Sequence, residues 1–175
     1  MGGSISAKSE KGKGSTFIVD LPLKLVNHEP APVAETPDET ELPDGGGARI
    51  LLVEDIEINR MLAETILEDS GFAVESVPDG CDAVEAFASH PEGYYDLVLM
   101  DIQMPVMNGY EATRAIRAME REDAKTIPII ALSANARDED KRMSMQSGMN
   151  HHIAKPFDVA NLISTVNDHI LTPRK

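Results

Sequence analysis

Five ionisable or hydroxyl-bearing residues each stand at the end of a short apolar run: Glu54, Asp55, Asp101, Ser133 and Lys155. Two carboxylates about 4 Å apart repel each other by roughly 4 kcal/mol at an effective dielectric constant of 20. Three carboxylates brought together therefore need a cation, and Mg²⁺ suits them because it binds carboxylates, keeps several waters and bridges to phosphates. An ammonium and a hydroxyl can bind phosphoryl oxygens. These residue types predict Mg²⁺-dependent phosphoryl transfer.

Taken singly, each residue has a structural alternative. Glu54 or Asp55 could cap a helix that begins near Ile56, Ser133 could be a turn residue, and Lys155 could be a solvated surface charge. Their coincidence at equivalent strand ends favours a site. The pattern shows no His, Ser or Cys nucleophile with a partnered base, which leaves a strand-end carboxylate as the acceptor.

Two kinds of hydrophobic pattern alternate along the part of the chain that would position these residues. Short apolar runs, typical of strands buried on both faces, alternate with apolar residues at helical spacing. The expected strands are residues 49–53, 73–77, 96–100, 127–132 and 151–154. Five strands alternating with five helices predict an α/β fold, a flavodoxin-like (βα)5 doubly wound parallel sheet of strand order 2-1-3-4-5. Its functional crevice lies at the carboxyl ends of the first and third strands.

The chain before residue 49 has a different composition. Residues 26–48 carry repeated prolines, acidic residues and three consecutive glycines, which predicts a flexible linker. Residues 1–25 contain two stretches of strand character, which predict a β-hairpin; a disordered tail is the alternative, since a lone hairpin is marginal in water. We therefore expect a flexible N-terminal extension, a folded domain over 49–171 and a short tail at 172–175.

Composition excludes several functional classes. The 175 residues include 16 Lys and Arg against 30 Asp and Glu, a formal net charge of −14, which argues against binding to nucleic acid or to an anionic membrane surface. One cysteine rules out an internal disulfide framework. No apolar run approaches the ~20 residues of a bilayer span, and no signal sequence is evident. A cytoplasmic location is predicted, and the oligomeric state is left open.

Four motifs, in order, resemble those of the receiver domain of two-component response regulators. They are Leu51-Leu52-Val53-Glu54-Asp55, the stretch from Asp96 to Gly109 (DLVLMDIQMPVMNG), Ala131-Leu132-Ser133-Ala134 and Ala154-Lys155-Pro156-Phe157. The resemblance covers about residues 49–171. It implies that Asp101 accepts a phosphoryl group from a phosphohistidine. It also implies that Asp55 and Asp101 bind Mg²⁺ directly, Glu54 through water, and the backbone carbonyl of Gln103 completes the protein ligands.

The same resemblance implies further roles. Lys155 pairs with the phosphate and precedes Pro156 in a cis peptide bond, and Ser133 is the hydroxyl that moves toward the phosphate during switching. Gln103 and Asn135 flank the acceptor pocket, where side chains tune hydrolysis of the phosphoryl group.

Two positions depart from the family pattern. Ile56 replaces a common Asn after the acidic pair, which should alter helix capping more than chemistry. His152 occupies a switch position that usually holds Tyr or Phe, and burying a charged imidazole is costly. We therefore expect activation to be loosely coupled. An unchanged phosphorylation-dependent shift of the following helix in His152→Tyr would count against this expectation.

The first 25 residues resemble the final hairpin of a histidine-kinase ATPase domain, with Gly-Gly-x-Ile, a Gly-x-Gly loop and Ser-Thr-Phe before a strand that ends in Leu-Pro. The order of segments implies the C-terminal part of a hybrid sensor histidine kinase, whose membrane anchoring stays open. Within a phosphorelay, Asp101 would pass its phosphoryl group to a histidine phosphotransfer domain or to water. Lacking the kinase centre, the chain is expected to catalyse only phosphorylation and dephosphorylation of its own aspartate.

Three rival functions are less consistent with the sequence. A binding-only pseudo-receiver would usually have lost one member of the acidic set or the lysine, and all are present here. An aspartyl-phosphate hydrolase of the dehalogenase type resembles Asp-x-Asp at the nucleophile, whereas Ile102 and Gln103 follow Asp101. Dinucleotide binding fails because no G-x-G-x-x-G follows the first strand.

Overall fold

The computed structural model describes residues 3–10, 12–20, 22, 46–134, 138–156 and 158–170 of the chain. These residues belong to two compact units, Met1–Glu39 and Thr40–Lys175, which are described separately. Most of the predicted linker, the predicted tail and Asn135 lie outside the described residues. Among the helices of the described ranges, none is long and apolar enough to cross a membrane.

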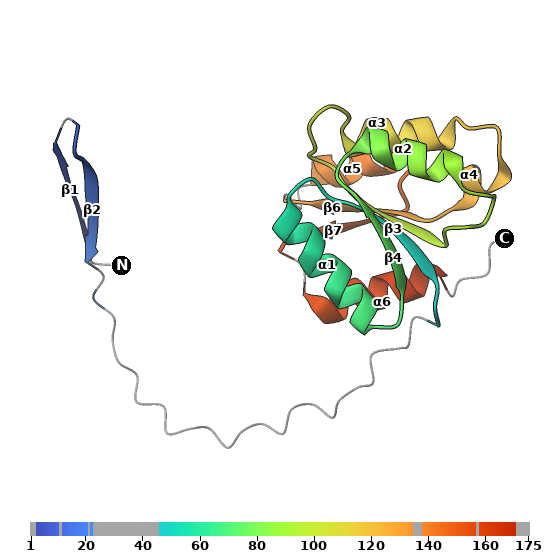
Figure 1. The fold of residues 1–175 in the computed structure, drawn as a ribbon, viewed down its shortest axis with the longest axis horizontal. Helices are drawn as coiled ribbons and strands as arrows, with labels where there is room; N and C mark the ends of the chain where they lie inside the picture. The colour runs from blue at the N-terminus through green and yellow to red at the C-terminus, as the bar shows by residue number, and fades with distance from the viewer. Residues whose placement is uncertain are drawn as a thin grey trace, which may run out of the picture. The chain divides into compact units, whose positions relative to one another are not determined.

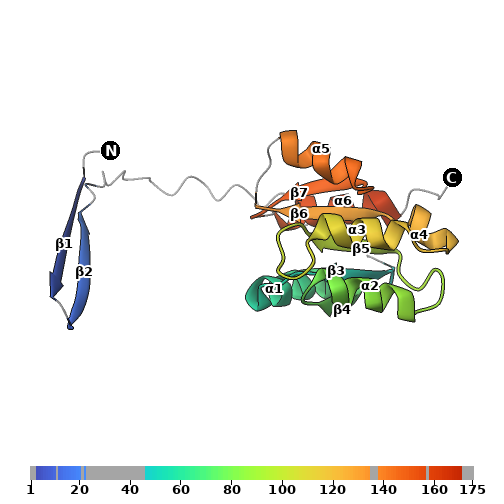
Figure 2. The same cartoon turned by 90° about the horizontal axis from the view of Figure 1, so that it is seen from above.

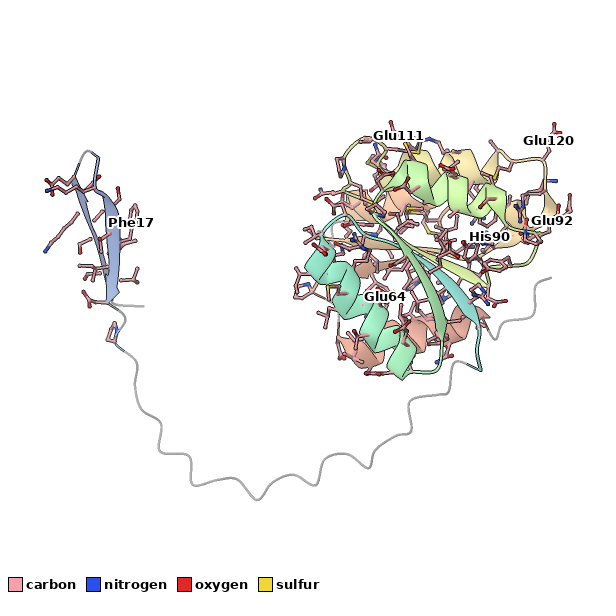
Figure 3. All side chains as sticks on the ribbon, viewed as in Figure 1. Phe17, Glu64, His90, Glu92, Glu111 and Glu120 are labelled. Carbon is pink, nitrogen blue, oxygen red and sulfur yellow. The ribbon has the colours of Figure 1, made fainter. Side chains whose placement is uncertain are left out.

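The first unit contains an antiparallel hairpin of β1 (Ser4–Glu10) and β2 (Gly14–Asp20) (Figure 1). Its turn needs positive φ angles at Gly12 (85°) and Gly14 (107°), which glycine adopts without steric cost. Ile5 pairs with Val19 and Ala7 pairs with Phe17, so these four side chains share one face of the hairpin. Phe17 is labelled on this hairpin in Figure 3, and Ile5, Phe17 and Val19 are exposed.

The second unit is built on a five-stranded parallel sheet. Its strands are β3 (Arg49–Val53), β4 (Ala73–Val77), β5 (Leu97–Asp101), β6 (Ile129–Ser133) and β7 (His151–Ala154). They lie in the order β4-β3-β5-β6-β7 (Figure 2), which confirms the predicted order 2-1-3-4-5. β5 and β6 each run one residue further than predicted, so Asp101 and Ser133 are the last residues of their strands.

Helices cover both faces of the sheet (Figures 1 and 2). They are α1 (Glu57–Asp69), α2 (Gly80–Ser89), α3 (Gly109–Arg117), α4 (Glu122–Thr126), α5 (Asp138–Gln146) and α6 (Val159–Ile170). One core cluster joins alternate strand residues to α1 and α6, and the other joins the remaining ones to α2 and α3. This two-sided burial explains why the strands are continuous apolar runs.

The short helix α4 was not predicted. Ala124 is the buried apolar residue of its five residues, so no helical periodicity marks it in the sequence. Arg121 precedes the helix and holds both carboxylate oxygens of Asp123 at 2.7 Å. Asp123 in turn accepts a hydrogen bond from the backbone N–H of Gly93 at 2.8 Å. Polar contacts, which a hydrophobic pattern cannot report, therefore fix this segment.

Candidate functional site

The carboxyl ends of β3 and β5 bring the three predicted acidic residues together. One carboxylate oxygen from each of Glu54, Asp55 and Asp101 lies within 4.8 Å of the others. Glu54 and Asp101 are 2% and 5% exposed, and Asp55 is half-buried. These strands are neighbours in the sheet, so their ends meet at one edge. The geometry is that of a compact oxygen-donor cluster.

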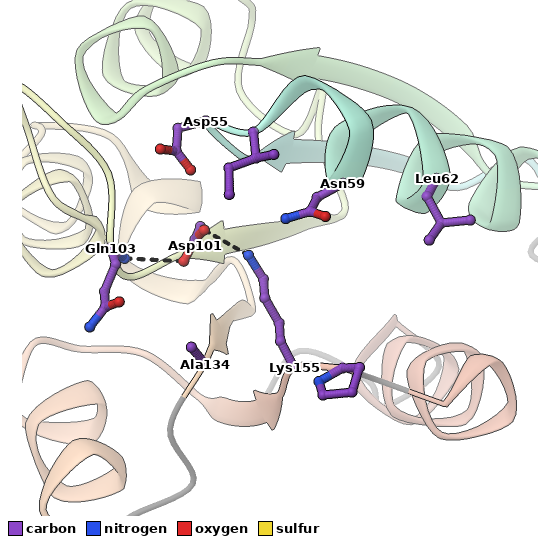
Figure 4. A pocket seen from close by; sticks show the side chains of 9 residues that line it. Asp55, Asn59, Leu62, Asp101, Gln103, Ala134 and Lys155 are labelled. Carbon is purple, nitrogen blue, oxygen red and sulfur yellow. Dashed lines mark hydrogen bonds and ion pairs between the residues drawn. The ribbon is translucent and has the colours of Figure 1, made fainter. Parts of the chain in front are cut away.

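Lys155 reaches this cluster from the end of β7 (Figure 4). Its Nζ donates to Asp101 Oδ2 at 2.6 Å and also to Glu54 Oε2. Its backbone N–H donates to the carbonyl of Ser133 at 2.7 Å, which ties it to the end of β6. The peptide bond to Pro156 is cis. A single ammonium thus bridges two buried carboxylates.

Asp101 is held on both of its carboxylate oxygens. While Lys155 binds Oδ2, the backbone N–H of Gln103 donates to Oδ1 at 3.1 Å. Burial raises the pKa of Asp101 above its ordinary value, the Lys155 ammonium and the Gln103 N–H oppose this, and the Glu54 charge adds to it. A cation near Asp101 therefore has a strong influence on its charge state.

The Glu54 carboxylate is held by two side chains. Asn59 Nδ2 donates to Glu54 Oε1 at 3.0 Å, while Lys155 occupies Oε2. The Arg60 guanidinium also donates to the backbone carbonyl of Glu54 at 2.8 Å. Sequence reasoning did not identify Asn59. The one available signal was a residue of modest helix propensity in the first turn of the helix that follows the acidic pair.

The alternative that Glu54 or Asp55 caps α1 is not realised. Ile56 occupies the N-cap position, and no side-chain hydrogen bond caps α1 within the described part of the chain. This agrees with the expectation that Ile56 in place of Asn alters capping. Because the Glu54 carboxylate is engaged by Asn59 and Lys155, it serves the cluster and not the helix.

A cleft of about 460 Å³ opens over the acidic cluster. Its lining consists of Asp55, Ile56, Asn59, Leu62, Asp101, Gln103, Ala134, Lys155 and Pro156 (Figure 4). One part of the wall is polar and the other is apolar, where Ile56 and Leu62 of the α1 region face solvent. The cleft can therefore accept a charged group at its base beside an apolar surface.

A tight loop beneath Asp101 connects β5 to α3. A Cβ at Gly109 would lie 2.2 Å from the Asp101 carbonyl oxygen, so only glycine fits there. The Gly109 N–H donates to the Ile102 carbonyl at 3.0 Å, and Asn108 forms a capping box with Glu111 that starts α3. This close approach fixes the backbone that carries the acceptor.

The predicted switch residues lie on β6 and β7. Ser133 is buried at the end of β6, and His152 is half-buried opposite Ala131 in the register of the two strands. His152 Nδ1 lies 3.3 Å from the Oγ of Ser144 in α5. Since that Oγ donates its proton to the Asp140 carbonyl at 2.9 Å, it accepts from the imidazole. His152 is thus linked to α5 by a polar contact that the sequence did not reveal.

Comparison with known families identifies the fold. Residues 50–167 match the response regulator receiver domain. The chain belongs to this family. The predicted resemblance to receiver domains is thereby confirmed. The chain is 38% identical over 167 residues to the aerobic respiration control sensor protein ArcB of Escherichia coli K12. It is 44% identical over 119 residues to the sensor protein GacS of Pseudomonas syringae pv. syringae.

These relatives are much longer than this chain. The ArcB match covers 95% of this chain and 20% of ArcB, and the GacS match covers 67% of this chain and 13% of GacS. The chain is thus homologous to receiver domains of hybrid sensor kinases and spans a fifth or less of those two proteins.

Solved receiver structures share the fold. The receiver domain of sensor histidine kinase PA1611 from Pseudomonas aeruginosa PAO1 is 43% identical, with a TM-score of 0.64 over 71% of this chain and 98% of that domain. Its structure has a magnesium ion coordinated in the active-site cleft. The chemotaxis protein CheY4 of Vibrio cholerae, 29% identical, also gives 0.64 over 69% of this chain and 97% of CheY4. These likenesses confirm the flavodoxin-like class.

Proposed function

We propose that this chain is the phosphoacceptor receiver of a hybrid sensor histidine kinase, and that Asp101 takes a phosphoryl group from a phosphohistidine. The observation that carries the proposal is the position of Asp101. It is a buried carboxylate at the base of an open cleft, next to two further acids and one lysine. A purely structural carboxylate would be expected to lie away from an open cleft and from two further acids.

The residues fit Mg²⁺, because the cluster offers carboxylate oxygens and hard divalent cations prefer oxygen ligands. Asp55 and Asp101 would hold the ion directly, Glu54 would act through water, and the Gln103 carbonyl would complete the protein ligands. The ion would neutralise charge on the acids and on the phosphoryl oxygens. The magnesium ion in the active-site cleft of the PA1611 receiver supports a magnesium site in this cleft.

The chain's own residues then perform the transfer. A carboxylate oxygen of Asp101 forms a bond to phosphorus as the bond from phosphorus to the donor imidazole nitrogen breaks, and that nitrogen keeps the electron pair. Lys155 stays close enough to bind a phosphoryl oxygen, and Ser133 donates its hydroxyl to another. Because the Gln103 N–H and the Gly109 contact fix the backbone around Asp101, the acceptor needs little reorganisation.

The apolar side of the cleft supports a protein donor. Ile56, Leu62 and Pro156 line the cleft beside Asp101, and Ile56 and Leu62 are exposed. An apolar rim of this kind suits packing of a helix that presents a histidine to the acids. Receiver domains of hybrid kinases take phosphoryl groups from such histidine-containing donors.

We also propose that residues 1–25 are the last hairpin of a kinase ATPase domain and residues 26–48 a linker. The match to ArcB, which extends over 95% of the chain, supports this. So does the apolar face made by Ile5, Ala7, Phe17 and Val19, since an exposed apolar face on a two-stranded hairpin is stabilised by packing on a larger body.

Phosphorylation by acetyl phosphate in the presence of Mg²⁺ tests the proposal by intact mass. The wild type should gain one phosphoryl group, Asp101→Asn should gain none, and the exposed Asp69→Asn should behave as the wild type. A wild type that gains no mass would indicate a binding-only pseudo-receiver. Sustained turnover of phosphate monoesters would instead indicate the hydrolase alternative.

A further inference from the structure

Glu54 is the most deeply buried carboxylate of the cluster and has a different partner on each oxygen. Lys155 binds Oε2, and Asn59 binds Oε1 at 3.0 Å. The ionised carboxylate only accepts hydrogen bonds, so the amide nitrogen of Asn59 must face it. A carboxylate with 2% exposure depends on such partners, because water cannot replace them.

Asn59 has no evident task within its own helix. It lies in the first turn of α1, whose N-cap position is Ile56, and its side chain donates a hydrogen bond to Glu54. Asparagine also forms helices less readily than alanine, by a few tenths of a kcal/mol. Figure 4 shows its amide reaching from α1 into the cleft between Asp55 and Lys155. The contact with Glu54 in the cleft, and not helix stability, therefore explains why an asparagine stands at this position.

The two partners of Glu54 differ in what the reaction demands of them. Lys155 is shared between Glu54 and Asp101, and under the proposed function it turns to a phosphoryl oxygen. Asn59 is neutral, and the phosphoryl group does not compete for its contact. When Lys155 moves away from Glu54, the hydrogen bond from Asn59 still holds the Glu54 carboxylate in place.

We infer that Asn59 is a positioning residue that fixes the Glu54 carboxylate so that Oε2 faces the Mg²⁺ site. This inference rests on the proposed function and concerns a residue outside the acid and lysine set. Removing a partner that orients a direct metal ligand typically weakens metal affinity 10–100-fold. Because Glu54 would act through water, loss of the Asn59 donor should raise the dissociation constant for Mg²⁺ by about tenfold, the lower end of that range.

The test compares Asn59→Leu, which keeps the approximate shape and removes the donor, with Asn59→Gln, which keeps an amide donor. Met61→Leu, an exposed position on the same helix, is the matched control. Isothermal titration of the metal-free chain with Mg²⁺ should show weakened binding in the Leu variant, substantial recovery in the Gln variant and no change in the control. Circular dichroism verifies folding, and Asn59→Ala replaces the Leu variant if that variant does not fold.

A second readout separates positioning from a folding defect. Acetyl phosphate labelling across a Mg²⁺ series should show a raised half-saturating Mg²⁺ concentration in Asn59→Leu, with the rate at saturating Mg²⁺ largely retained. Misfolding would lower the saturating rate and leave the half-saturating concentration unchanged. A folded Leu variant that binds Mg²⁺ like the wild type overturns the inference alone. A wild type that neither binds Mg²⁺ nor labels on Asp101 overturns the proposed function as well.

Discussion

Lys155→Met removes the one ammonium that bridges Glu54 and Asp101 and keeps a side chain of similar length. The two carboxylates are within 4.8 Å of each other and nearly fully buried. If both stay ionised, they repel by about 3.5 kcal/mol at an effective dielectric constant of about 20. Removing one partner of a buried ion pair typically costs 3–5 kcal/mol. Since Lys155 is itself slightly exposed, we expect a loss of about 3 kcal/mol in the free energy of unfolding near pH 8.

The sign of the pH dependence follows from Asp101. Burial already raises its pKa, and loss of the ammonium that opposes burial raises the pKa further. The native state of the variant then binds a proton more tightly than the unfolded chain does. The stability that this proton contributes is therefore lost as the pH rises from the ordinary carboxyl pKa through the raised one, so the deficit of the variant relative to the wild type grows with rising pH.

Urea unfolding followed by circular dichroism measures this effect, in EDTA and in excess Mg²⁺. Mg²⁺ should restore much of the lost stability in the variant, because it supplies the missing positive charge. Lys125→Met is the matched control, since the Lys125–Glu122 pair is exposed and its loss should change little. The reasoning is refuted if Lys155→Met is as stable as the wild type near pH 8 without Mg²⁺, or if its deficit is insensitive to both pH and Mg²⁺.

Three further perturbations test the surroundings of the cleft. Gly109→Ala places a Cβ 2.2 Å from the Asp101 carbonyl oxygen, so the free energy of unfolding should fall by about 3 kcal/mol in urea titrations; unchanged stability would show that this loop yields easily. Val106 has φ 66° and is 86% exposed, a backbone conformation that a β-branched residue adopts at a cost. Val106→Asn should therefore stabilise the domain by about 1 kcal/mol, while Val106→Thr, still β-branched, should give no such gain. His152→Tyr should enlarge the phosphorylation-dependent change in amide hydrogen exchange over α5, and an equal change in both proteins would contradict loose coupling.

The fold was accessible from the sequence because its strands are buried on both faces. Ile50, Leu52 and Leu99 pack toward α1 and α6, while Leu51 and Val98 pack toward the other face, so neither side of a strand can carry polar residues. Right-handed crossovers then leave few strand orders. Because parallel strands end at a common edge, the convergence of the acids and the lysine followed from the same pattern.

The hydrogen bonds between side chains of different elements could not be predicted from the hydrophobic pattern. Asn59 is one polar residue among several in an amphipathic helix, and its role depends on the angle at which α1 passes Glu54. The contact between His152 and Ser144 depends on where α5 lies over β7. A period of 2 or 3.6 residues reports which face is buried, but it does not report which polar atoms meet across elements.

The acidic cluster also explains why β5 ends in a buried charged residue, whereas its other residues are buried and apolar. Every residue of β5 is buried, and its last one is an aspartate whose pKa burial raises. Three carboxylates meet one bridging ammonium in the described site, so their charge is not balanced. The two apolar clusters on either face of the sheet offset that local cost, and the surplus negative charge attracts a divalent cation. The same imbalance that weakens the metal-free fold therefore prepares the cleft for a metal ion and a phosphoryl group.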